Sequence, residues 1–221
     1  MKTRDVALTG LMTALVLVIT RAFVLPIPQT KGFFNLGEAG VYMAAVLFGP
    51  GVGALAGGIG SALADVTLGY AQYAPFTLVI KGIEGALVGV IARGTSRQAW
   101  IVGLAAGAIA ALWLFTVEAA AAAAVRLSAG VLLVAALGGL ALLARRRGGR
   151  AAARVAGMIS GGLVMVAGYF VSQAYLLGLG TPAALAEVPY NLVQVAVGVV
   201  AGLAALTTFE RALLTQPDRQ R

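Results

Sequence analysis

Residues 39–68 read AGVYMAAVLF-GPG-VGALAGGIGSALADVTL, two apolar segments on either side of a Gly-Pro-Gly tripeptide. Proline ends a helix and glycine permits a sharp bend, so the tripeptide at 49–51 predicts a turn between two helices. Both segments, 39–48 and 52–68, are rich in glycine and alanine, which let helices pack closely inside a membrane. This stretch therefore predicts a helical hairpin of a membrane protein.

The rest of the chain has the same character. Of its 221 residues, 60% are hydrophobic and 11% are charged, whereas soluble domains carry about 25% charged residues. A helix needs about 20 apolar residues to cross a bilayer. Six further apolar segments cover residues 6–25, 75–92, 100–120, 125–144, 155–177 and 189–209. We therefore predict an all-α integral membrane protein with about eight spans, in a single domain of residues 1–221.

The net charge of +8 indicates topology. With eight spans, the basic residues before 6–25 and after 75–92, 125–144 and 189–209 all fall on one side, including five arginines within 145–154. Only Arg21, Lys31 and Arg126 fall on the other side. The positive-inside rule then places both termini in the cytoplasm. Because no aromatic or soluble module accompanies the arginines, nucleic acid is not an expected partner.

The missing residue types exclude several chemistries. Without Cys or His, the chain has no thiolate or imidazole metal site and no Ser-His or Cys-His catalysis. None of its three lysines follows a P-loop pattern. We therefore expect no enzyme activity, catalytic residue, metal or cofactor, and the energy for any transport must come from a partner or an ion gradient.

Polar residues inside apolar segments are candidates for a functional site, because burying them in a membrane is costly. At 1.5 Å per residue, Lys81 and Glu84 lie about 9 and 14 Å below Pro75, at the outer end of their segment. Other polar residues gather at the same outer level, although their segments run in both directions. They are Asn35, Glu38, Asp65, Tyr70, Tyr73, Tyr169, Gln173, Glu187, Asn191 and Gln194.

This distribution predicts a cup that opens outward and is closed below, suited to a small, flat, polar ligand. Glu187, Asn191 and Gln194 are spaced i, i+4, i+7, which places them on one helix face. Two plainer interpretations stay open. Lys81 and Glu84 could neutralise each other as a contact between helices, and Tyr70 and Tyr73 could be interfacial aromatic residues.

Several motifs carry a resemblance to a known family. They are NLGE at 35–38, LFGP at 47–50, GGIGSALAD at 57–65, GY at 69–70, APFT at 74–77, KGIEG at 81–85, GY at 168–169 and EVPYN at 187–191. Over about residues 3–95 and 155–210, the sequence resembles the substrate-binding S components of energy-coupling-factor (ECF) vitamin transporters, in the riboflavin-transporter-like group.

The resemblance implies a six-helix bundle that binds a vitamin in an outward cup. It also implies docking on a transmembrane T component that carries two ATPase subunits, through a small-xxx-small motif that Gly10 and Ala14 match here. Two departures stand out. Residues 98–150 are expected to form an inserted transmembrane helix pair with a basic cytoplasmic loop, and Gln173 stands where an acidic residue is expected.

The expected function is therefore uptake of a vitamin or precursor of the riboflavin, hydroxymethylpyrimidine or pyridoxine type, across the plasma membrane of a prokaryote. A stand-alone facilitator or ion-coupled carrier is the alternative, although the sequence shows no inverted repeat and no ladder of polar residues through the membrane. A lipid-modifying enzyme using Asp65, Glu38 and Glu84 ranks last.

Overall fold

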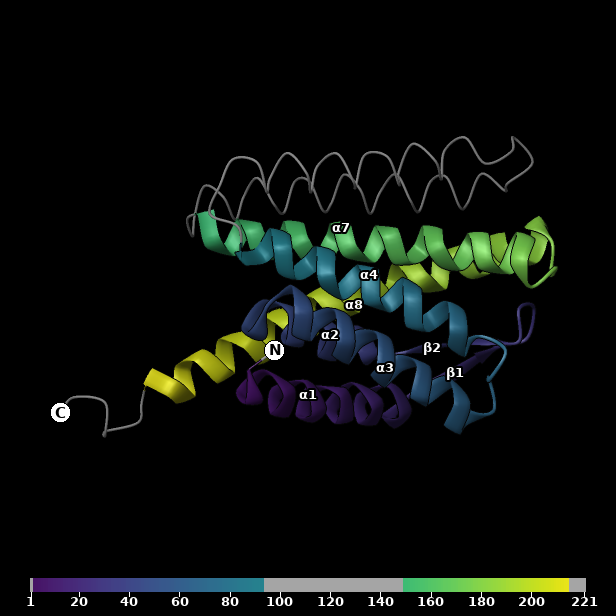
Figure 1. Ribbon diagram of the computed structural model, residues 1–221. Coiled ribbons are helices and arrows are strands. Elements are labelled where there is room, and N and C mark those ends of the chain that lie inside the picture. Colours follow the sequence, from purple (N-terminus) through teal and green to yellow (C-terminus); the bar gives the residue numbers. More distant parts are fainter. Residues whose placement is uncertain (1, 94–148, 215–221) are drawn as a thin grey trace.

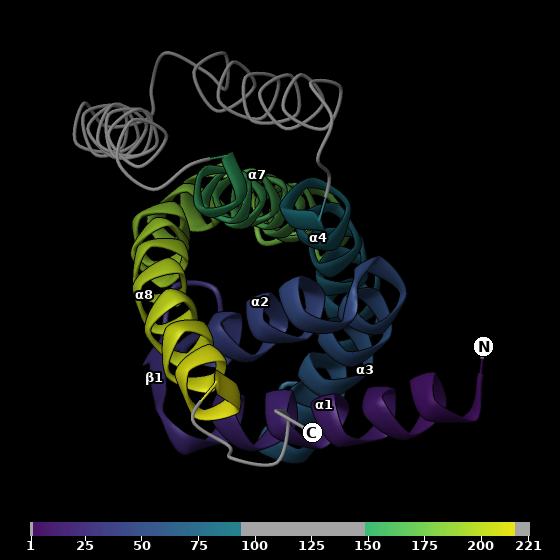
Figure 2. The same cartoon turned by 90° about the vertical axis from the view of Figure 1, so that its left-hand side faces the viewer.

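The computed structural model describes residues 2–93 and 149–214, and these residues form one helical bundle. Six α-helices lie within them: α1 (Thr3–Ala22), α2 (Gly37–Phe48), α3 (Pro50–Leu68), α4 (Ala74–Arg93), α7 (Gly149–Val171) and α8 (Thr181–Leu214). Five of the six are long and apolar enough to cross a membrane, and α2, with 12 residues, is shorter. Viewed end-on, α2 runs across the inside of a ring made by the other five (Figure 2).

The turn between α2 and α3 falls where the sequence predicts it. α2 ends at Phe48 and Pro50 is the first residue of α3, a position where proline loses no helical hydrogen bond. Gly49 has φ +95°, and a β-carbon there would lie 2.2 Å from the Arg93 guanidinium. Glycine therefore fits both the backbone conformation and the close approach of α4.

The all-α prediction needs one correction. The helix expected to run to residue 25 ends at Ala22, and an antiparallel hairpin follows, made of β1 (Val24–Ile27) and β2 (Gly32–Asn35). Pro26 explains the change, because a residue that precedes proline is disfavoured in helical conformation. The hairpin lies at the same end of the bundle as the α3–α4 and α7–α8 connections, here called the hairpin end (Figure 1).

The last two helices are also longer or less regular than the sequence predicts. α8 begins at Thr181 rather than residue 189, and Pro189 lies inside it. A π-helical turn, Ser172–Leu176, follows α7. The expected spans at 100–120 and 125–144, and the inserted pair at 98–150, lie outside the described residues apart from the first two residues of α7. The eight-span count and the cytoplasmic termini stay predictions.

Glycines bring the helices into backbone contact, as the small-residue seams predict. A β-carbon on Gly85 of α4 would lie 2.2 Å from the carbonyl oxygen of Gly53 in α3. One turn along, a β-carbon on Gly57 would lie 3.0 Å from the carbonyl oxygen of Lys81. These contacts fix α4 against α3 and turn the polar face of α4 toward the inside of the bundle.

Candidate functional site

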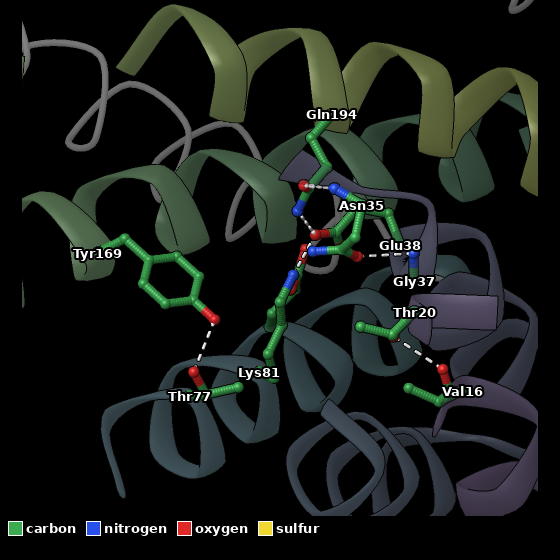
Figure 3. A network of polar contacts seen from close by, with 10 residues as sticks. Val16, Thr20, Asn35, Gly37, Glu38, Thr77, Lys81, Tyr169 and Gln194 are labelled. Atoms are coloured by element: carbon green, nitrogen blue, oxygen red, sulfur yellow. Dashed lines mark hydrogen bonds and ion pairs between the residues drawn. The ribbon is translucent and has the colours of Figure 1, made fainter. Parts of the chain in front are cut away.

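A buried ionic cluster joins three helices in the middle of the bundle. The ammonium group of Lys81, on α4, bonds the carboxylate of Glu38, on α2, and lies 3.0 Å from Oε2 of Glu84. The Gln194 amide on α8 donates to Glu38 Oε1 at 2.7 Å and accepts from the backbone N–H of Asn35 at 2.8 Å. These contacts tie α2, α4, α8 and the end of β2 together (Figure 3).

The sequence left two interpretations of Lys81 and Glu84 open, part of a ligand site or a neutralising contact between helices, and the cluster has features of both. The two side chains do form an i, i+3 ion pair, but Lys81 also reaches Glu38, and its side chain is only 4% exposed. One ammonium group thus faces two carboxylates away from water. Because a buried charge needs a partner, the positive charge of Lys81 is balanced by Glu38 and Glu84 of the same chain.

A cavity of about 440 Å³, counted with the solvent at its mouth, opens above this cluster. Its walls come from α1, β2, α3, α4, α7 and α8 and from the residue before α4. The lining residues are Thr20, Gly32, Phe33, Asn35, Ser61, Asp65, Tyr73, Thr77, Lys81, Tyr169, Glu187, Asn191 and Gln194.

Two hydrogen bonds join the turn of the β-hairpin to residues that line the cavity. The Thr30 hydroxyl donates to the Glu187 carboxylate on α8, and the Tyr73 hydroxyl donates to the Thr30 carbonyl oxygen at 2.6 Å. Burial raises the pKa of Tyr73 to about 12, and the nearby Glu187 carboxylate adds to this effect. The phenol is therefore a neutral hydrogen-bond donor at physiological pH.

The walls also contain a hydroxyl pair and an aromatic ring. Tyr169, on α7, and Thr77, on α4, place their hydroxyl oxygens 2.9 Å apart. The Tyr169 ring centre is 6.0 Å from the Lys81 ammonium nitrogen, at the limit of a cation–π contact. An aromatic face beside hydroxyl and amide groups can stack on a flat ring and bond its edges.

The structure brings most of the predicted site residues to this cavity. The α8 face is confirmed: Glu187, Asn191 and Gln194 all line the cavity and are at most 4% exposed. Asn35, Asp65, Tyr73, Lys81 and Tyr169 line it too. That these residues bind a ligand stays a prediction.

The other four predicted residues do not line the cavity. Glu38 and Glu84 lie buried behind Lys81. Gln173, in the π-helical turn, is fully buried near Glu187 and Tyr73. Tyr70 is partly exposed, and its ring centre lies 4.6 Å from that of Phe33 in the hairpin, as an interfacial aromatic residue could.

Sequence reasoning missed several lining residues. Ser61 and Thr77 each precede a predicted site residue, Asp65 and Lys81, by one helical turn, so the i, i+4 spacing could have found them. Thr20 and the hairpin residues Gly32 and Phe33 had no such signal. Thr20 reaches the cavity from the last turn of α1, whereas Gly32 and Phe33 reach it because the chain turns into a hairpin after Ala22.

Comparison with known proteins places this chain in a family. A family model described as the S component of an ECF-type riboflavin transporter matches residues 1–138. An uncharacterised protein in the gap 3′ region of Pyrococcus woesei is 35% identical over 187 residues, 85% of this chain and 88% of that protein. The thiamine precursor transporter HmpT of Lactococcus lactis subsp. cremoris is 35% identical over 99 residues, 44% of this chain and 57% of HmpT.

These findings agree with five helices apolar enough to cross a membrane, and they indicate a multi-pass membrane protein of a transporter family rather than of an enzyme class. The chain belongs to the family of S components of ECF-type riboflavin transporters.

Proposed function

We propose that this chain binds a water-soluble vitamin or vitamin precursor in the cavity at the hairpin end and serves as the substrate-specificity subunit of an ECF importer. The observation that carries the proposal is the cavity itself: it is lined by amide, hydroxyl, carboxylate and aromatic side chains and closed below by the Lys81 cluster. Such a mixture recognises a flat, polar ring by stacking and edge hydrogen bonds.

The ligand class follows from the same lining and from the relatives. Riboflavin is named by the matching family, and HmpT is named a thiamine precursor transporter. Riboflavin, hydroxymethylpyrimidine and pyridoxine all combine an aromatic ring with several hydrogen-bonding groups. We propose that the ligand is of this type.

The energy is proposed to come from a T component and two ATPase subunits in a prokaryotic plasma membrane, with both termini of this chain in the cytoplasm. Gly10 and Ala14 support a docking surface on α1. Both are exposed, and a β-carbon on Gly10 would have no atom within 4 Å. The small-xxx-small seam of α1 is therefore open to a second helix, unlike those of α3, α7 and α8.

The decisive experiment is to purify the full chain in detergent and identify the compound that co-purifies, then measure its affinity by titration. Binding of a vitamin or precursor supports the proposal. A protein that binds none of the three named ligands, and that does not associate with a T component, would refute it.

A second experiment separates the proposal from a stand-alone carrier. Vesicles that contain this chain alone should not accumulate the ligand, whereas vesicles that also contain the T component and ATPases should do so when ATP is supplied. Uptake by the chain alone would favour the facilitator or ion-coupled carrier.

A further inference from the structure

Two nitrogen donors form the floor of the cavity, and one carboxylate oxygen holds them side by side. Lys81, on α4, and Gln194, on α8, both line the cavity. Both also bond Oε1 of Glu38: the Lys81 ammonium group forms an ion pair with it, and the Gln194 amide donates to it at 2.7 Å. The two nitrogens are therefore neighbours, and Glu38 sets their spacing (Figure 3).

The orientation of the Gln194 amide follows from its two partners. Its oxygen accepts from the backbone N–H of Asn35 at 2.8 Å, while its nitrogen donates to Glu38. The reverse orientation would set the amide NH₂ against a donor and the amide oxygen against a carboxylate, and both contacts would be repulsive. The amide oxygen is thus occupied, and the second N–H of Gln194 has no partner among the described residues.

Lys81 likewise has a donor without a partner. An ammonium group carries three N–H donors and no acceptor. One of them bonds Glu38, and Oε2 of Glu84 lies 3.0 Å from the nitrogen. Within residues 2–93 and 149–214, the third donor meets no acceptor. An unpaired buried donor is costly, so an acceptor on a ligand is favoured at this position.

The walls of the cavity discriminate less than its floor. Thr77 and Tyr169 present hydroxyl groups, and a hydroxyl group can turn either to donate or to accept. Lys81 and Gln194 can only donate toward the ligand, because the oxygen of Gln194 already bonds Asn35. A ligand that turned a donor or a C–H group toward the floor would leave two buried donors unpaired, which lowers its affinity.

We propose that Lys81 and Gln194 determine the specificity of the site by binding two hydrogen-bond acceptors on one edge of a heteroaromatic ring. Two ring nitrogens, or a ring nitrogen and a carbonyl oxygen, are acceptors of this kind. Glu38 is a positioning residue, because it sets the spacing of the two donors without lining the cavity. The inference rests on the proposed function, because it concerns the same cavity.

The test compares each of the three named ligands with analogues in which one ring nitrogen is replaced by a C–H group. The analogues are 1-deazariboflavin and 5-deazariboflavin, the two pyridine analogues of hydroxymethylpyrimidine, and the benzene analogue of pyridoxine. Each compound is titrated into the full-length protein in lipid nanodiscs at pH 7. For the ligand that binds, we expect at least one analogue to lose about 10- to 100-fold in affinity, because it leaves a buried donor unpaired. Losses below about 10-fold for every analogue would overturn the inference.

Variants show whether the two donors cause this discrimination. Gln194→Met removes the amide and keeps the length of the side chain. Lys81→Met is combined with Glu84→Gln, which removes the carboxylate left without a counter-charge. For the analogue that loses affinity, the variant that lacks the facing donor should reduce the ratio of ligand affinity to analogue affinity to about 3-fold or less.

The affinity ratio separates recognition from general loss of structure, because both compounds meet the same variant. Glu84→Gln alone and Thr207→Ala, on the exposed part of α8, should leave the ratio unchanged. A ratio that stays the same in Gln194→Met and in the Lys81→Met/Glu84→Gln variant would contradict the assignment. Failure of riboflavin, hydroxymethylpyrimidine and pyridoxine all to bind would instead count against the proposed function.

Discussion

Replacing Lys81 with methionine removes a charge while it keeps the length of the side chain. Lys81 contacts Glu38 and Glu84, and the three side chains are at most 4% exposed. Loss of one partner from a buried ion pair costs about 3–5 kcal/mol, because the remaining charge is left uncompensated. We expect Lys81→Met to lower the free energy of unfolding by about this amount, and to lower ligand affinity because Lys81 lines the cavity.

Arg154→Met provides the matched control. Arg154, on α7, and Glu210, on α8, form another ion pair between helices, with 2.6 Å between nitrogen and oxygen, but their side chains are 26% and 41% exposed. Exposed pairs contribute about 0–1 kcal/mol. The two methionine variants should therefore differ by several kcal/mol, although each removes one basic residue from an ion pair.

The assay is unfolding in mixed detergent micelles, followed by circular dichroism as the fraction of denaturing detergent rises. Glu84→Gln should be almost neutral in the parent protein, where Lys81 still faces Glu38, but stabilising in the Lys81→Met background, where it removes an uncompensated carboxylate. Equal effects of Glu84→Gln in both backgrounds, or equal losses in Lys81→Met and Arg154→Met, would refute the idea of an electrostatically coupled cluster.

Three further predictions test the cavity and the docking surface. Asn191→Ala should weaken ligand binding by about 1–3 kcal/mol, measured by titration, because it leaves a ligand group unpaired, whereas Thr207→Ala on the exposed part of α8 should have no effect. Gly10→Val should leave the unfolding free energy almost unchanged but abolish ATP-dependent uptake with the T component; normal uptake would contradict the docking surface. Because the pKa of Tyr73 is raised to about 12 in the folded protein, its contribution to stability is fully present below pH 10 and is lost as the pH rises toward 12. The unfolding free energy of Tyr73→Phe, measured across this pH range, should therefore fall less than that of the parent protein.

The parts of the site that could be predicted from the sequence are those that depend on helical periodicity. Glu187, Asn191 and Gln194 share a face by spacing alone, and the depth of Lys81 follows from the rise per residue. These arguments hold because α4 and α8 are continuous helices at those positions, although Pro189 lies within the stretch of α8 concerned. Even the unexpected early start of α8 left the spacing intact.

The remaining features depend on contacts between distant parts of the chain. The bond from Lys81 to Glu38 joins residues 43 positions apart, and that from Gln194 to Glu38 joins residues 156 positions apart. The hydrogen bond from the Thr30 hydroxyl to the Glu187 carboxylate depends on the β-hairpin. The sequence predicts helix up to residue 25 and no hairpin after it. Spacing within one segment carries no information about which buried acid a buried base will meet.

The close packing of a glycine in α8 holds the buried Glu38 of α2 in position, and one substitution tests this idea. A β-carbon on Gly198 of α8 would lie 2.3 Å from the β-carbon of Glu38, whereas one on Gly202, a turn further along the same helix, would meet its nearest atom at an ordinary 3.5 Å. Gly198→Ala should therefore displace Glu38 and cost about 1–3 kcal/mol as overpacking does, and it should also lower ligand affinity through Lys81.

Gly202→Ala should do neither, because alanine fits there and is the better helix former. If both alanine variants have the same unfolding free energy and the same ligand affinity, Gly198 has no special role in positioning Glu38. If only Gly198→Ala loses affinity, the close approach of α8 to α2 is what holds the Glu38–Lys81 pair in place beneath the ligand.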